Sequence, residues 1–306
     1  MEHRLHGIIT VLNTPFTETG QLDLPGLGRH VRYAVDAGVA GFLMPALASE
    51  AEYLTGAEKQ AAVAEVVAAA AGEAAVIGGA SADSPAEQLR LSRQYLALGC
   101  DGVLVQLTPS ASAEQLAEDL LPIAELDPPM LMLQDWDFQG PGHPLSTILY
   151  LRERLKPFTW LKIEVENAGP KYSEVLAATE GRLRVAGGWA VRQMIDGLDR
   201  GVHAFMPTGM HRIYVEIYRR YVQGDRDGAT ALFTQIAPVL AFSNERLETS
   251  ILFFKRLLYR QGVYHTTAVR FRDASFAPAE VRAADALIDL IIGLESQLER
   301  CSPERT

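Results

Sequence analysis

Short apolar segments alternate with Ala- and Leu-rich helical stretches along the first two-thirds of the chain. Near-continuous apolar runs such as 102–105 are typical of parallel strands that are covered on both faces. The strand–helix unit recurs eight times within about 220 residues, which favours an α/β protein with a (β/α)8 (TIM) barrel over an open doubly wound sheet. The predicted strands are Gly7–Leu12, Gly41–Met44, Ala75–Gly78, Gly102–Gln106, Met130–Gln134, Trp160–Glu164, Arg184–Gly187 and His203–Met206.

Polar residues and glycines mark the ends of several intervening helices. Thr55, Ser84 and Ser112 each precede a Glu or Gln by three residues, which is the pattern of a capping box at a helix start. Gly38 and Gly99 follow helical stretches, where glycine readily takes the left-handed conformation that ends a helix. These signals support the division of the chain into strands and helices.

The strand pattern stops at about residue 210. The remaining segments predict helices with no strands between them, which is more helix than a barrel needs. We therefore expect a catalytic barrel domain over residues 1–222 and a C-terminal helical subdomain over residues 223–306. The predicted helices are Ile213–Val222, Asp227–Arg246, Ser250–Gln261 and Ala277–Leu298.

Composition excludes several functional classes. The chain has 28 Lys and Arg against 38 Asp and Glu, and a net charge of −10 opposes binding to nucleic acid. The apolar runs are shorter than the roughly 18 to 20 residues of a membrane helix, and the first residues lack a signal-peptide pattern. We expect a cytoplasmic protein with a small-molecule substrate and no nucleic-acid or membrane partner.

Two cysteines, Cys100 and Cys301, lie far apart in the sequence. They form no CxxC pair and no Cys/His ligand spacing, so neither a disulfide framework nor a zinc site is expected. Cys100 stands between a predicted helix and the next strand, where a buried thiol acts as a small apolar side chain. The sequence predicts no metal site.

Lys162 is a cationic residue inside an otherwise apolar predicted strand, 158–165. Burial of an ammonium group is costly and lowers its pKa. At the ordinary lysine pKa of about 10.4, only about one amine in a few thousand is neutral at pH 7. A lowered pKa makes the amine nucleophilic, so Lys162 is the candidate for Schiff-base catalysis. The alternative is that Lys162 has only a structural role.

Other polar residues stand at the carboxyl ends of predicted strands, where barrel enzymes place their active sites. Glu164 shares a strand face with Lys162 and is either an acid/base group or an ion-pair partner. Gln134 and Asp135 end the fifth strand and are expected at the same mouth, Asp135 as a proton shuttle or a loop-capping residue. The candidate substrate-binding residues are Ala48, Ser49, Glu50, Gly187, Gly188 and Pro207.

With Lys162 in place, the chain resembles the dihydrodipicolinate synthase / N-acetylneuraminate lyase family of class I aldolases. The resemblance implies a Schiff base at Lys162, no organic cofactor, and homo-oligomers, commonly tetramers or dimers. The motifs that carry it, in order, are 7–16 (GIITVLNTPF), Asp23-Leu24, 37–42 (AGVAGF), Glu50 with Leu54-Thr55 and Glu58, 76–79 (VIGG), 97–103 (ALGCDGV) and 160–162 (WLK).

The chain departs from this family at several functional motifs. Ala46-Leu47-Ala48-Ser49-Glu50 stands where the family carries Gly-Thr-Thr-Gly-Glu. Gln134-Asp135 replaces the Tyr-Asn pair that ends the fifth strand, and Leu107–Ser110 replaces paired tyrosines. The arginine that some members use for a second carboxylate is absent from Phe138–Gly142. These departures predict divergence from true dihydrodipicolinate synthase.

Three functional hypotheses follow. The first is a carbon–carbon or carbon–oxygen lyase that forms a Schiff base with a 2-oxo acid, such as pyruvate or a sugar-acid derivative. The second is a dehydratase or deaminase that uses the same imine. The third is a catalytically silent family member that binds a ligand, and the retention of a costly Lys162 argues against it.

Overall fold

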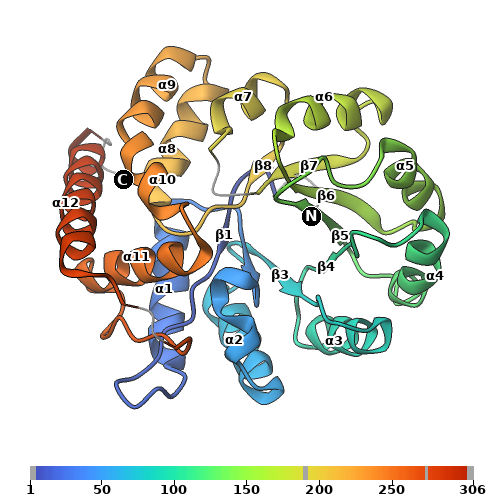
Figure 1. Ribbon diagram of the computed structural model, residues 1–306, viewed down its shortest axis with the longest axis horizontal. Helices are drawn as coiled ribbons and strands as arrows, with labels where there is room; N and C mark the ends of the chain where they lie inside the picture. Colours follow the sequence, from blue (N-terminus) through green and yellow to red (C-terminus); the bar gives the residue numbers. More distant parts are fainter. Residues whose placement is uncertain (1–4, 189–191, 273–274, 302–306) are drawn as a thin grey trace.

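The computed structural model, which describes residues 5–188, 192–272 and 275–301, shows a closed barrel of parallel strands inside a ring of helices (Figure 1). The strands follow one another in chain order, and the last pairs with the first. The predicted (β/α)8 barrel is confirmed. Its strands are β1 Gly7–Val11, β2 Gly41–Met44, β3 Ala75–Gly79, β4 Gly102–Gln106, β5 Leu131–Asp137, β6 Phe158–Val165, β7 Arg184–Gly187 and β8 Ala204–Phe205.

The helices of the barrel alternate with these strands, and further helices follow them. Two short 3-10 helices, η1 Leu47–Ser49 and η2 Ala51–Tyr53, form the loop after β2. The α-helices are α1 Leu24–Ala37, α2 Gly56–Ala70, α3 Pro85–Ala97, α4 Ala113–Ala124, α5 Leu145–Arg154, α6 Ala168–Ala178, α7 Met194–Asp199, α8 His211–Val222, α9 Arg226–Gln235, α10 Ala237–Ser243, α11 Leu247–Arg260 and α12 Pro278–Cys301.

The predicted helix Asp227–Arg246 is wrong as a single element, because the structure divides it into α9 and α10. Pro238 lies in the first turn of α10. Proline has no N–H to donate, and its ring clashes with the carbonyl group four residues earlier, so it kinks or breaks a helix in whose interior it lies. The break turns the chain and brings the segment after α10 back toward the barrel.

The helix ends follow local chemistry, with one correction. Thr55 and Glu58 form a complete capping box. Ser84 and Ser112 also accept bonds from backbone amides in the first turns of α3 and α4. The return bond of a capping box, from the Glu or Gln side chain to the backbone of the capping serine, is absent in both helices. Glu87 instead accepts a bond from Arg90, and Gln115 donates one to Asp119. Gly38 and Gly99 have φ of +93° and +97°, as expected for left-handed helix ends.

Side chains on the strands alternate between two cores. Those that point inward fill the barrel, as Met132 and Trp160 do, and those that point outward, such as Leu133 and Leu161, pack beneath the helices. Cys100 is buried in the outer core, as predicted, and the side chain of Cys301 lies outside the described residues. This alternation decides which polar residues reach the mouth of the barrel.

Helices α9–α12 gather on one side of the barrel, beside α1 and α8 (Figure 1). Their contacts include the packed rings of Phe242, Phe253 and Phe276, and ion pairs that join Arg256 to Asp285 and Arg260 to Asp289. The predicted C-terminal helical region is confirmed, and its division from the barrel at residue 222 stays a prediction. In the described part of the chain, none of the helices combines the length and the apolar character needed to cross a bilayer.

Candidate functional site

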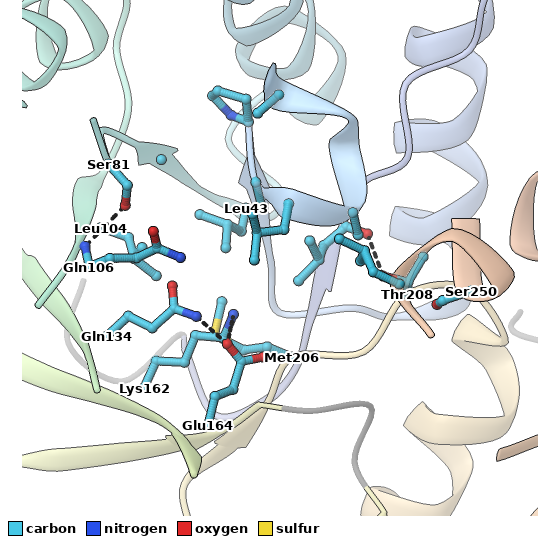
Figure 2. A pocket seen from close by; sticks show the side chains of 18 of the residues that line it. Leu43, Ser81, Leu104, Gln106, Gln134, Lys162, Glu164, Met206, Thr208 and Ser250 are labelled. Carbon is cyan, nitrogen blue, oxygen red and sulfur yellow. Dashed lines mark hydrogen bonds and ion pairs between the residues drawn. The ribbon is translucent and has the colours of Figure 1, made fainter. Parts of the chain in front are cut away.

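A cavity of about 480 Å³ lies at the carboxyl ends of the strands. Its lining includes the loop after β2, the ends of β4, β5 and β6, and the start of α11. Figure 2 shows Ser81, Gln106, Gln134, Lys162 and Glu164 gathered toward one side, and Ser250 at the other. The position agrees with the mouth at which barrels of this type carry their active sites.

Lys162 and Glu164 point into this cavity from β6. The Nζ atom of Lys162 lies 3.2 Å from a carboxylate oxygen of Glu164, and only 4% of the lysine is exposed. Gln134 stands opposite Lys162 in the β5–β6 register, and its amide donates a hydrogen bond to the same Glu164 oxygen. The prediction that Lys162 and Glu164 share a strand face is confirmed, and Gln134 joins them.

Gly188, which follows β7, makes room for the Glu164 side chain. A Cβ atom at this position would overlap the Cγ and carboxylate atoms of Glu164. The backbone amide of Gly188 also donates a hydrogen bond to the carbonyl of Ile163, 3.0 Å away. This bond keeps β6 and the segment after β7 close together. Gly188 was predicted to bind substrate, and the structure instead places it behind Glu164, where it does not line the cavity.

The prediction that Asp135 faces the mouth is wrong. Side chains alternate along a strand, so Gln134 points inward and Asp135 points outward with Leu133. Asp135 is completely buried, forms an ion pair with Lys171, and accepts a hydrogen bond from the amide of His143. Lys171 also donates to the carbonyls of Pro141 and His143, at 2.6 and 2.7 Å, so this pair holds the loop between β5 and α5.

Ser49 and Glu50 support the loop after β2 and do not line the cavity, and their role in substrate binding stays a prediction. The Ser49 hydroxyl donates to the carbonyl of Leu12, 2.6 Å away, and accepts from the amide of Ala46. Glu50 forms an ion pair with Lys255 of α11. Ala48, which precedes Ser49 in η1, does line the cavity.

Gly187 and Pro207 also lie outside the cavity lining, and strand alternation again explains it. Gly187 faces Phe205 on the helix side of the barrel. The carbonyl of Pro207 accepts a hydrogen bond from the amide of Val11. Their neighbours Met206 and Thr208 line the cavity instead.

The C-terminal helices contribute a wall that the sequence analysis missed. Most of its members follow α10, in a part of the chain where the predicted strands offer no guide. A polar interval between two apolar helices, 243–246, is the signal that marks this wall in the sequence. The lining residues are Leu240 of α10 and, further along the chain, Asn244, Arg246, Leu247, Ser250 and Phe254.

The charge of the cavity differs from that of the chain. Among the described lining residues the cations are Lys59, Lys162 and Arg246, and the carboxylate is Glu164. The chain as a whole carries a net charge of −10. A locally cationic cavity in an acidic protein favours an anionic ligand.

Sequence comparisons relate the chain to one family. A model of the dihydrodipicolinate synthetase family matches residues 4–132. The 4-hydroxy-tetrahydrodipicolinate synthase of Moorella thermoacetica is 42% identical over 98 residues, which are 32% of this chain and 34% of the relative. The synthase of Parasynechococcus marenigrum is 27% identical over 244 residues, covering 76% of this chain and 78% of the relative.

The alignments with the first two relatives, from Moorella thermoacetica and Gluconacetobacter diazotrophicus, span about a third of each relative. The family match ends at residue 132, within β5, so it does not reach Lys162 or Glu164. The family model therefore covers the first half of the barrel, whereas the chemistry of the site rests on the geometry of the second half.

Solved structures extend the similarity of fold to nearly the whole chain. Dihydrodipicolinate synthase from Rhodopseudomonas palustris has a TM-score of 0.87 and 22% identity, and the match covers 94% of this chain and 98% of that one. The 4-hydroxy-tetrahydrodipicolinate synthase from Methylacidiphilum fumariolicum SolV has a TM-score of 0.86 and 19% identity, covering 96% and 98%. At these identities the structures share a fold with this chain.

Proposed function

Because this chain belongs to the dihydrodipicolinate synthase / N-acetylneuraminate lyase family, we propose that it is a class I lyase that joins Lys162 to a 2-oxo acid as a Schiff base. One observation carries the proposal. Lys162 is buried at the mouth of the barrel, its amine points into a cavity, and a carboxylate lies 3.2 Å away on the same strand face.

The Lys162–Glu164 pair has the elements of this chemistry. An ammonium group must lose a proton before it attacks a carbonyl carbon, and Glu164 is close enough to accept that proton. The amine adds to the ketone and water leaves, which forms a protonated imine. When the C3–C4 bond of the substrate breaks, the imine accepts its electron pair. The reaction therefore needs no organic cofactor.

Gln134 holds Glu164 in place through its amide. The Tyr-Asn pair that the resemblance leads one to expect at the end of β5 is Gln134-Asp135 here, and Asp135 faces away from the cavity. We therefore assign the acid/base role to Glu164. The same replacement supports a substrate different from that of the synthase relatives.

The substrate is proposed to be an acid because three cationic side chains line the cavity. Ser81 and Gln106 add polar groups at the side where Lys162 lies (Figure 2). The Ser81 hydroxyl oxygen accepts a bond from the backbone N–H of Gln106, which leaves the hydroxyl proton available for a ligand. Loss of water or ammonia from the same imine is the alternative reaction, and both begin with the Lys162 adduct.

Reductive trapping tests the proposal. The protein is incubated with pyruvate and borohydride, and the adduct is mapped by mass spectrometry. We expect modification at Lys162, no adduct in Lys162→Met, and an unchanged adduct in Lys156→Met, which removes an exposed lysine outside the cavity lining. Absence of any adduct with pyruvate and a panel of 2-oxo acids refutes Schiff-base chemistry and favours a ligand-binding protein.

A further inference from the structure

The polarity of the cavity lining differs from one side of the cavity to the other. Polar side chains gather around Lys162 at one side, and Ser250 of α11 lies at the far side with Leu43 between them (Figure 2). A cavity of about 480 Å³ falls in the range of about 300 to 1,000 Å³ that is common for sites of larger ligands. Pyruvate alone leaves most of this space unfilled.

The floor of the cavity is apolar. Val11, Leu43, Leu104 and Met206 line it, and these four also belong to the core inside the barrel. Side chains of this kind offer no hydrogen bonds to a ligand. A polyhydroxylated sugar chain placed against them would lose its bonds to water without replacement, at a cost of about 1 to 3 kcal/mol for each buried hydroxyl.

Three large apolar side chains also stand at the rim of the cavity, beside the exposed Arg246. Leu47, Phe138 and Leu247 line the cavity and are 46%, 41% and 38% exposed. They come from three separate parts of the chain: η1, the loop after β5, and the first turn of α11. Large apolar side chains that gather at a cavity mouth are typical of ligand-binding sites.

Buried ion pairs hold two of these rim residues in place. The Glu50–Lys255 pair anchors the loop that carries Leu47, and the Asp135–Lys171 pair anchors the loop that carries Phe138. A rim that is already ordered loses less conformational entropy when a ligand binds. The apolar surface is therefore built into the fold.

We propose that the substrate is a 4-hydroxy-2-oxo acid with an aromatic or alkyl group at C4, and that this group occupies the apolar part of the cavity. The proposal rests on the proposed Schiff-base function and adds the class of substrate. The oxo acid part lies at Lys162, and the apolar group extends toward Leu47, Phe138 and Leu247.

The reaction balances as a retro-aldol cleavage. The Lys162 amine replaces the C2 oxygen, which leaves as water, and Glu164 takes the proton of the C4 hydroxyl. The C3–C4 bond breaks, its electron pair moves into the enamine, and an apolar aldehyde leaves. Protonation at C3 and addition of one water then release pyruvate and restore Lys162, so the water lost on imine formation is returned.

Competing substrates define the test, since Arg246 also lines the cavity and offers a partner for an anionic tail. We would measure kcat/KM for 4-hydroxy-2-oxo acids that carry phenyl, n-pentyl, trihydroxypropyl or carboxymethyl groups at C4. The phenyl and pentyl compounds are expected to exceed the other two by about 100-fold. A preference for the hydroxylated or the dianionic compound overturns the proposal.

Matched variants locate the preference. Leu47→Ser and Phe138→Ser are expected to lower kcat/KM for the phenyl compound by about tenfold or more, with little effect on the borohydride trapping of pyruvate. Leu121→Ser is the control, because Leu121 is 45% exposed on α4 and does not line the cavity. Equal effects of all three substitutions would contradict a role for the rim.

Calorimetry with ligands that cannot form an imine separates the two proposals. The protein is expected to bind 4-phenylbutanoate and not gluconate. If pyruvate is trapped at Lys162 but the phenyl compound is not preferred, the substrate class is wrong and the Schiff-base function stands. If no adduct forms and 4-phenylbutanoate still binds, the Schiff-base function is wrong and the apolar recognition stands. Absence of both results refutes both proposals.

Discussion

At the scale of single residues, the position of Glu164 depends on a glycine that directly follows the next strand. Gly188 is packed so closely against the Glu164 side chain that a Cβ atom would overlap it. Its φ is not in the left-handed region, so the requirement for glycine here is one of space alone. Glu164 therefore reaches Lys162 only because position 188 carries no side chain.

The substitution Gly188→Ala tests this dependence. We expect it to displace the Glu164 carboxylate and lower kcat by about 100-fold. Glu164→Gln, which removes the acid/base group itself, is expected to lower kcat by a factor of about 10² to 10⁴. Turnover and the pH profile of borohydride trapping would be measured for both. Gly56→Ala is the matched control, because a Cβ there meets no atom within 4 Å. Wild-type turnover in Gly188→Ala would contradict the positioning role.

At the scale of elements, one ion pair joins the loop after β2 to α11. Glu50 has a φ of 55° and is 1% exposed, and its two oxygens bind Lys255 and the amide of Arg270. Burial lowers the pKa of Lys255 to about 8, although the Glu50 carboxylate opposes the shift. The Lys255 amine also lies 4.3 Å from the centre of the Phe16 ring. The cavity loop and the C-terminal helices therefore share one buried charge pair.

Lys255→Met is expected to lower the free energy of unfolding by about 3 to 5 kcal/mol, because it leaves the Glu50 carboxylate buried without its cation. The double variant Glu50→Gln with Lys255→Met should recover part of that loss, since no unpaired charge remains. Urea denaturation measures both. Arg90→Met, which removes an exposed ion pair on α3, is the control and should change little. A stable Lys255→Met protein would show that the pair is not required.

At the scale of the whole molecule, a chain of buried hydrogen bonds links β1, α1, α8 and the segment after α11. Tyr264 donates to the carbonyl of Asn13, so its oxygen accepts from Nδ1 of His30. With both rings neutral, Nε2 of His30 accepts from Nε2 of His211, whose Nδ1 accepts from Thr10. This consistent assignment requires both histidines to be neutral.

Burial lowers the pKa of His30 well below its ordinary value, with a further contribution from His211. Burial, and then the charge of Arg212, lowers the pKa of His211 to about 3. The unfolded chain binds protons at about pH 6.5, whereas the folded pair does not. The stability that the neutral pair supplies is therefore complete above about pH 6.5 and is lost as the pH falls toward 3.

This pH dependence has a measurable size. His211 contributes up to about 1.4 kcal/mol of unfolding free energy per pH unit between about pH 6 and 4. His211→Gln should be less stable. Its unfolding free energy, measured by urea denaturation at several pH values, should also depend less steeply on pH, by about that amount. Replacement of the exposed His265 by Gln serves as the control. An unchanged slope in His211→Gln would refute a neutral buried His211.

Glu295 affects the same measurement with the opposite sign. Burial raises the pKa of its carboxyl group to about 7, so its contribution to stability is complete below about pH 4.5 and is lost as the pH rises through 7. Tyr33 and Gln261 donate hydrogen bonds to it from α1 and the end of α11. Glu295 is present in both proteins, so the difference between wild type and His211→Gln isolates the histidine.

The sequence by itself determined the barrel and its principal candidate residue. Near-continuous apolar runs, capped helices and glycine stops are local signals, and eight repeats of them allow one closed arrangement. Lys162 was identifiable because a cation is out of place in an apolar strand. Glu164 followed from the two-residue period of that strand, which also separates Gln134 from Asp135 once the register is known.

Only the tertiary structure decided which residues share the cavity. Arg246, Leu247 and Phe138 reach its mouth through helix packing and loop anchoring, which join segments about 100 residues apart in the sequence. Gly188 was selected for its place after a strand, and its close contact with Glu164 depends on how β6 and β7 pair. Local patterns specify elements, whereas the contents of a cavity depend on long-range packing that no local pattern records.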